Sequence, residues 1–352
     1  GSLSPMLLAR SLVRPRSTFA LARALATKAE TVKALEADQK AVVEALEACS
    51  SKDEFVKLNE TTLAPLAKKM KAIDPSMSWT FARVLCKPEG PPTVVAVTGA
   101  GTATGAEALY RIAAGEMLGG SQAITLQVSG ADPAVLKDLK DCAFPCLAGV
   151  TTSPNAAAAV KGAKYAIILE GGDAALGGSL EADAIVAVKG MANAAAVDSK
   201  APKGAVVTGI TRTLQASAEV QIANKVGCSV DKVSRVVVWG NDAIDVSSAT
   251  IDGKWAVDVL QGWSPEATEP SPHVGADAVV AHMKDLVVGA KEGEWSSMGM
   301  KAQGDYGLGT GFYYSVPVTC ARGGGDARRV GGIPISPELA QAMEAQRVAL
   351  SK

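Results

Sequence analysis

A glycine-rich turn directly after an apolar segment is the first feature of this sequence with a clear chemical use. Residues 94–98 read VVAVT, and glycines follow at Gly99, Gly101 and Gly105. An apolar strand that runs into such a turn and then a helix is typical of dinucleotide-binding folds, in which the glycines let the backbone approach a pyrophosphate. The turn therefore predicts a site for NAD. A structural strand–helix turn without a ligand is the alternative.

Histidine could supply proton transfer, and the sequence has only two, His273 and His282. Histidine is the usual proton carrier of acid–base catalysis near neutral pH. His273 lies in a proline-rich stretch, SPEATEPSPH, which indicates an exposed loop. His282 lies in a predicted helix over residues 276–288, where we expect it to be packed. Neither position favours a catalytic imidazole.

The cysteines give no sign of a metal site. Six are scattered along the chain, and only Cys142 and Cys146 are close together. Without partner ligands at metal-site spacing, such a pair predicts free thiols in the core. We expect no bound metal.

Composition excludes two classes of function. The 352 residues carry a net charge of -1 and have no large basic block, which argues against nucleic-acid binding. No apolar run reaches the length of a membrane span. At 48% hydrophobic residues, the chain can form one large or two ordinary domains.

The N-terminal segment has the composition of a targeting sequence. Residues 6–26 contain four arginines, several serines, threonines and alanines, and no acidic residue. This pattern predicts a mitochondrial presequence over residues 1–26 and a location in the matrix or on the matrix side of the inner membrane. A plastid address and an amphipathic N-terminus are the alternatives.

Residues 27–90 are predicted to form a helical hairpin followed by a linker. Apolar residues recur at helical spacing in two stretches, and the sequence KPEGPP closes the segment. The hairpin could pack on the main domain or dock a protein partner, and the sequence does not decide between them.

Strands and helices alternate from Thr93 onward. The predicted strands are 94–98, 124–128, 166–170 and 205–208, and the predicted helices are 105–114, 134–142 and 180–198. Such alternation implies a doubly wound parallel sheet of the Rossmann type, which we assign to a domain over residues 91–208.

The last part of the chain mixes element types and predicts an α+β domain over residues 209–352. We expect helices at 215–226, at 276–288 and from Pro337 onward, a strand at 233–239, and antiparallel strands at 295–301 and 311–318.

Six longer strings, in order along the chain, point to a family. They are RIAAGEMLG (111–119), CAFP (142–145), VVWGN (237–241), EGEWSSMG (292–299), YYSVPVTC (313–320) and GIPIS (332–336). Together they make the chain, from about Thr93 to its end, resemble the cytosolic-type (also plastid-type) malate dehydrogenases. The resemblance implies a Rossmann fold, hydride transfer between NAD and malate or oxaloacetate, and a homodimer. It also implies a histidine–aspartate pair and arginines that hold the substrate carboxylates.

The chain departs from this family at each catalytic position. The catalytic histidine position holds Asp242, and the catalytic aspartate and a third arginine correspond to Leu214 and Ser217. The two arginines of the carboxylate clamp correspond to Ala175 and Glu181. An Asn-Pro motif and about twenty residues expected after Gly209 are missing.

The nucleotide-binding positions are partly changed. The family has glycine at the first, fourth and seventh positions of the turn, and here the fourth is Thr102, with Gly101 displaced by one. The acidic residue that binds the adenosine ribose corresponds to Gly130, and Asp132 lies two residues on.

Three hypotheses follow. The first is a malate dehydrogenase homologue without catalysis that acts as a structural or assembly subunit of a mitochondrial complex, such as a respiratory complex or ATP synthase, with residues 27–90 as a contact. The second is an active NAD-dependent oxidoreductase that uses Asp242 or Asp245 as its proton carrier. The third is a regulatory module that binds NAD(H) at Gly99–Gly105 without turnover.

Overall fold

The computed structural model describes Thr61 and residues 91–352 except 121, 143, 145, 292, 322, 323 and 352. The chain divides into two compact units, Gly1–Lys87 and Pro88–Lys352, and the second is described below. The predicted presequence (1–26) and helical hairpin (27–90) lie outside the described residues. The predicted domain boundary at 208/209 falls inside a strand and stays a prediction.

Six parallel strands form one half of a large sheet. They are β1 (Thr93–Thr98), β2 (Ile124–Ser129), β3 (Leu147–Ser153), β4 (Tyr165–Ile168), β5 (Ile185–Lys189) and β6 (Val206–Ile210). Their order is β3-β2-β1-β4-β5-β6. The connections reverse direction between β1 and β4, so this is a doubly wound sheet with its switch point at the carboxyl ends of those two strands. The predicted Rossmann-type architecture is confirmed.

Three antiparallel strands extend the same sheet to nine. They are β12 (Ser296–Gln303), β13 (Thr310–Cys320) and β14 (Ala327–Arg329), and β12 pairs with β6. At this junction Gly209 lies opposite Gly299, and a Cβ on either would collide with the Met191 thioether at 2.8 Å or less. The two glycines therefore let β12 join the parallel half.

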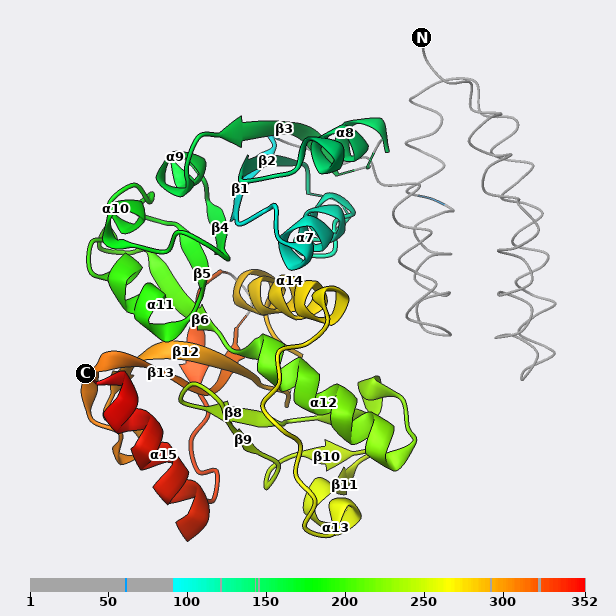
Figure 1. Cartoon of the computed structure of the whole chain (residues 1–352), viewed down its shortest axis with the longest axis vertical. Helices are drawn as coiled ribbons and strands as arrows, with labels where there is room; N and C mark the ends of the chain where they lie inside the picture. The colour runs from blue at the N-terminus through cyan, green and yellow to red at the C-terminus, as the bar shows by residue number, and fades with distance from the viewer. Residues whose placement is uncertain are drawn as a thin grey trace, which may run out of the picture. The chain divides into compact units, whose positions relative to one another are not determined.

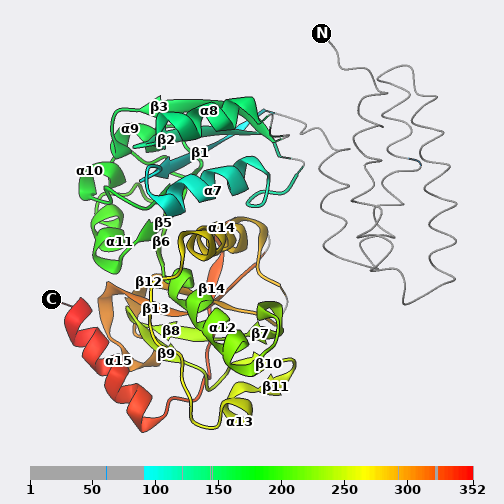
Figure 2. The same ribbon diagram turned by 45° about the vertical axis from the view of Figure 1, so that its right-hand side comes forward.

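Helices cover both faces of the parallel half (Figures 1 and 2). On one face lie α7 (Ala103–Ala113), α8 (Pro133–Asp141) and α14 (Pro272–Val288), and on the other lie α9 (Ala156–Val160), α10 (Ala174–Gly177) and α11 (Met191–Asp198). Alternation along β1 explains the two layers, because Val95 and Val97 pack in the first core and Ala96 in the second.

The last part of the chain also contains α12 (Arg212–Val226) and several shorter elements. They are η2 (Val230–Lys232), β7 (Val233–Ser234), β8 (Val237–Trp239), β9 (Ala243–Asp245), β10 (Thr250–Ile251), β11 (Lys254–Trp255), α13 (Ala256–Leu260), η3 (Asp305–Gly307) and α15 (Pro337–Leu350). A third small core joins α12 to β7, β10 and α13 through Ile222, Val233, Ile251 and Leu260. The α+β character predicted for this part of the chain is confirmed.

The predicted helix over 180–198 is wrong. Its first half is β5, and only Met191–Asp198 is helical. The sequence IVAVK is apolar on both sides, because β5 is covered by helices on both faces, and such a run has no periodicity to separate strand from helix. Gly190, at φ +89°, makes the turn between the two elements.

The predicted strand over 233–239 is also wrong as one element. Arg235 has φ +63°, so the chain bends there. β7 then pairs with β10, and β8 pairs with β9 in a different sheet. The sequence analysis also missed β3 and α9, whose residues alternate weakly.

The described part of the chain contains no helix long and apolar enough to cross a membrane. Its four cysteines form no disulfide with one another. The expected core position holds for Cys146 and Cys320 and is wrong for Cys142, which is exposed at the end of α8. No group of three His, Cys, Asp or Glu side chains within these residues is arranged to hold a metal ion.

Candidate functional site

The glycine turn after β1 has the backbone of a dinucleotide-binding turn. Gly99 adopts φ +68°, and a Cβ there would lie 2.9 Å from Cγ of Glu170. A Cβ on Gly105 would lie 2.3 Å from the Gly99 carbonyl oxygen, so α7 begins in direct contact with the turn. Both positions require glycine, and they place the N-terminus of α7 at the switch point of the sheet.

The side chain of Thr102 is hydrogen bonded to the backbone N–H of Gly105, a group that a bound phosphate would use. Its Oγ1 accepts a hydrogen bond from Gly105 N at 3.0 Å and donates to Gly99 O at 2.8 Å. Thr102 is the N-cap of α7, so its side chain satisfies one of the free N–H groups at the helix start. A pyrophosphate at this turn competes with a side chain of the protein.

The loops after β1 and β2 touch at two other glycines. A Cβ on Gly101 would lie only 2.2 Å from Gly130 O. Gly130 is the position where the resemblance implies the acidic residue for the ribose. Asp132, the nearby substitute considered from the sequence, accepts from Ala134 N at 2.7 Å and caps α8. Its carboxylate is therefore committed to the fold.

Glu170 adds a negative charge to the turn. It follows β4 and is exposed, and its backbone oxygen accepts a hydrogen bond from Thr98 Oγ1. Its Cγ lies against Gly99, as described above. A carboxylate beside the phosphate position opposes the binding of an anionic dinucleotide. The sequence analysis missed this residue, although its place directly after a parallel strand was a usable signal.

The loop that carries the carboxylate clamp in the family is a short packed helix here. Asp173 caps α10 by accepting from Leu176 N at 2.8 Å, and Ala175 is exposed on that helix. Glu181 accepts from Gly162 N at 3.0 Å and so joins two loops of the sheet. Neither position presents a cation that could hold a carboxylate.

Asp242, at the position where the resemblance implies the catalytic histidine, is hydrogen bonded to the C-terminal helix. It lies in the β8–β9 turn and accepts from Gln346 Nε2 at 2.5 Å. The same Gln346 accepts from Asn241 N at 3.1 Å. Gln346 also packs against Gly240, because a Cβ added to Gly240 would lie only 2.6 Å from the Cβ of Gln346. One side chain of α15 therefore contacts Gly240, Asn241 and Asp242, although the last two stay exposed to solvent. Sequence reasoning did not anticipate this contact.

Asp245, the other proposed proton carrier, is a buried structural carboxylate. It accepts from Trp239 Nε1 at 3.1 Å and from Ser247 N at 2.7 Å. Ser217, on α12, is hydrogen bonded to Thr268 Oγ1 at 3.1 Å, and Leu214 is half-buried on the same helix. No hydrogen bond or ion pair of the described residues joins Asp242 to Ser217 or to the loop of Ala175.

His282 is packed in α14, as the sequence predicted. It is fully buried, and its Nε2 lies 2.9 Å from Thr208 Oγ1. Burial, helped by the charge of Arg212, lowers the pKa of this imidazole to about 3. It stays neutral at physiological pH and has no access to a substrate.

The predicted loop position of His273 is wrong, although its predicted exposure is right. α14 begins at Pro272, so His273 lies in the first helical turn, with its side chain 73% exposed. Ser271 caps this turn by accepting from Val274 N. Proline is favoured at the first helical position because it has no N–H to satisfy there.

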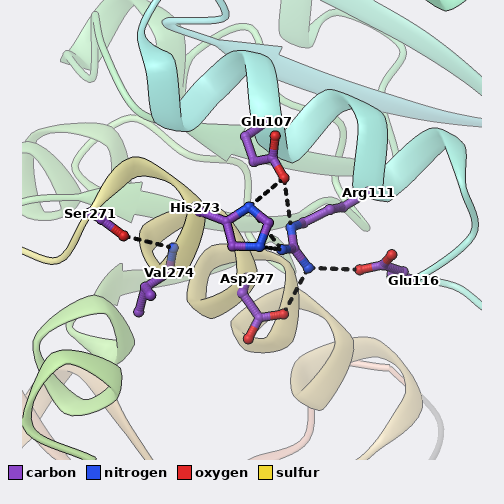
Figure 3. Close-up of polar contacts among 7 residues, drawn as sticks. All are labelled: Glu107, Arg111, Glu116, Ser271, His273, Val274 and Asp277. Atoms are coloured by element: carbon purple, nitrogen blue, oxygen red, sulfur yellow. Dashed lines mark hydrogen bonds and ion pairs between the residues drawn. The ribbon is translucent and has the colours of Figure 1, made fainter. Parts of the chain in front are cut away.

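His273 belongs to an ionic cluster between α7 and α14 (Figure 3). Its Nδ1 lies 2.9 Å from Glu107, and its Nε2 lies 3.0 Å from Arg111. Arg111 also pairs with Glu116 at 3.1 Å and with Asp277 at 3.0 Å. The cluster fastens one helix to the other, and every polar group of the histidine is used in it.

Comparison with known proteins supports the fold described above. No protein-family model matches the chain. A malate dehydrogenase from Naegleria fowleri is 28% identical, with a TM-score of 0.62, over 74% of this chain and 96% of that one. The chain has the fold of the lactate and malate dehydrogenases.

Two further structures show how widely this dehydrogenase fold is shared. A Trichomonas vaginalis lactate dehydrogenase, solved with NADH and oxamate, is 23% identical with a TM-score of 0.62. A Plasmodium falciparum malate dehydrogenase is 14% identical with a TM-score of 0.56. Each comparison covers 74% of this chain and 96% of the other.

Proposed function

We propose that this chain is a non-catalytic relative of the malate dehydrogenases and serves as a structural or assembly subunit of a mitochondrial complex. The observation that carries the proposal is the contact between Asp242 and Gln346. Reduction of a keto acid needs a proton donor at the substrate oxygen, and the residue at that position is a carboxylate held by α15.

The charge of the site supports the same conclusion. The sequence has no lysine or arginine between Lys164 and Lys189, the segment that includes α10. A dicarboxylate binds through charge-assisted hydrogen bonds to arginine, so this loop lacks the chemistry to hold it. Glu170 adds a like charge at the nucleotide turn.

The proposed location and partner rest on the sequence. The arginine-rich, acid-free segment 6–26 supports import into mitochondria, and residues 27–90 are the proposed contact with a protein partner. A respiratory complex or ATP synthase fits a matrix protein of this kind. Homodimerisation, which the resemblance implies, is the competing assembly.

Binding of NAD(H) without turnover is a second candidate. It is favoured by the turn itself, because Gly99 and Gly105 keep the backbone that a pyrophosphate needs. Thr102 and Glu170 oppose such binding, so we expect weak affinity.

Native fractionation of mitochondria tests the proposal. The band that contains this chain would be identified by mass spectrometry, and the same fractions assayed for oxaloacetate-dependent NADH oxidation. The proposal predicts migration in a large assembly with no activity above background. Migration at the mass of a dimer, together with activity that follows the chain through a second column, would contradict it. The Naegleria fowleri malate dehydrogenase serves as the positive control for the assay.

A further inference from the structure

Arg235 is held in an unusual backbone conformation at a junction between two sheets. Its φ of +63° is in the left-handed region, which is costly for a residue with a Cβ. It follows β7 and precedes β8, which pair with different strands. Backbone strain of this kind, at a residue with a long charged side chain, often marks a functional position.

The side chain of Arg235 stacks on Trp295 and has no acceptor. The guanidinium carbon lies 5.1 Å from the centroid of the indole ring. Arg235 Nε and Trp295 Nε1 are both buried without a hydrogen-bond partner. Among the described residues, no carboxylate forms an ion pair with this guanidinium. A buried donor without an acceptor is costly, so the arrangement is incomplete as it stands.

This pair lines a cavity of about 670 Å³. The cavity lies between α12, α14, η2 and the segment before β12, and its other cations are Arg111, Arg212 and Lys291. Its volume is within the range of small-molecule sites. It lies apart from the glycine turn and from Asp242, neither of which lines it.

Most of the acidic side chains around the cavity are already engaged. Asp285 pairs with Arg212 at 2.9 Å and accepts from Ser296 Oγ at 3.0 Å. Asp277 pairs with Arg111 in the cluster of Figure 3.

Glu219 accepts from Gln215 at 2.9 Å, and burial raises the pKa of its carboxyl, which favours the neutral form. Arg235 and Lys291 are therefore cations of the cavity without an ion-pair partner among the described residues. Two opposing charges remain: Glu294, which has no partner for its carboxylate, and Asp231, whose carboxylate accepts a hydrogen bond from Ser229 Oγ and has no ion-pair partner among the described residues.

We propose that this cavity binds a small molecule bearing an oxyanion, a phosphate or a carboxylate, and that Arg235 is the residue that contacts it. The planar guanidinium suits such a group, and the indole beneath fixes its orientation. The proposal concerns a site distinct from the glycine turn and from Asp242, and it does not depend on whether the chain is catalytic.

Calorimetric titration of the full chain with inorganic phosphate, and separately with acetate, tests this site at constant ionic strength with chloride as the balancing anion. We expect saturable binding of at least one of the two, and the tighter one identifies the oxyanion class. Arg235→Gly should weaken the binding of that anion at least tenfold. This variant should fold well, because glycine accepts the φ of +63° without strain.

Two further variants sharpen the test. Arg328→Met removes an exposed arginine that does not line the cavity and should leave the affinity unchanged. Glu294→Gln removes one of the two opposing charges and should tighten binding severalfold. Absence of saturable binding by both anions, or equal affinity in Arg235→Gly and the parent chain, would overturn the proposal.

Discussion

Gln346 donates a hydrogen bond of 2.5 Å to Asp242 across 104 positions of sequence. The contact joins the C-terminal helix to the turn that carries the proton-transfer histidine in the family the sequence resembles. The position of this turn therefore depends on the packing of α15.

Gln346→Ala should destabilise the protein. It removes the bonds to Asp242 and to Asn241 N, which together contribute about 1–3 kcal/mol to the free energy of unfolding. Urea denaturation measures the change. The matched control is Gln341→Ala, an exposed position on the same helix, which should change stability by less than about 0.5 kcal/mol. Equal effects of the two would show that α15 does not depend on this contact.

Two adjacent glycines test whether α10, in the loop where the resemblance implies the carboxylate clamp, is packed on α11. A Cβ on Gly177 would lie 2.0 Å from Val197 O in α11, whereas the nearest atom to one on Gly178 is 3.7 Å away. Gly177→Ala should therefore cost about 1–3 kcal/mol of stability. Gly178→Ala should be neutral or stabilising by up to about 1 kcal/mol. If both variants unfold at the same urea concentration as the parent, α10 is not packed on α11.

Thr102→Gly should strengthen binding of NADH. It frees the amide of Gly105, which is worth about 1.4 kcal/mol or a tenfold lower Kd if one hydrogen bond to phosphate is gained. The helix should survive, because glycine is nearly as good an N-cap as threonine. Ala103→Gly is the control for added backbone freedom in the same turn. Fluorescence titration with NADH measures both, and an unchanged Kd in Thr102→Gly would mean that the threonine does not block the turn.

The buried His282 makes stability depend on pH on the acidic side. Its pKa falls from 6.5 to about 3 in the folded chain, mainly through burial and secondly through Arg212. Between these values the unfolded chain binds a proton that the folded chain does not. The stabilising contribution is complete above pH 6.5 and is lost as the pH falls toward 3, at about 1.4 kcal/mol for each pKa unit.

His282→Gln should flatten this acid-side loss, because an amide cannot take up the proton. Urea denaturation between pH 3 and 6.5 measures the free energy of unfolding of His282→Gln. The control is His273→Gln, which removes the exposed imidazole instead. A profile for His282→Gln that follows the parent chain would contradict the origin assigned to the pH dependence.

The sequence predicted the layered sheet well, because its signals are local. The apolar run at 94–98 and the glycine at Gly99 specify a strand and a turn, and Pro337 marks the start of the last helix. β5 was mistaken for a helix because a strand buried on both faces has no period of two. The left-handed backbone of Arg235 could not be predicted from the sequence, because arginine rarely adopts a positive φ.

The sequence predicted which residues stand at the site positions, but it did not predict their hydrogen-bond partners. Alignment with a family located Asp242, Ala175 and Glu181, but the partners that determine what they do come from distant segments. Gln346 Nε2 donates to Asp242, and Gly162 N donates to Glu181. Only the three-dimensional packing reveals that Asp242 is bonded to α15 and that Glu181 joins two loops.

The most direct test of the account is the rate of NADH oxidation by the purified full chain with oxaloacetate and with pyruvate. The account predicts no turnover above the buffer background, at any concentration of nucleotide that the assay tolerates. Turnover that is retained through purification and abolished by Asp242→Asn would contradict it, because the carboxylate held by Gln346 would then be a working proton carrier.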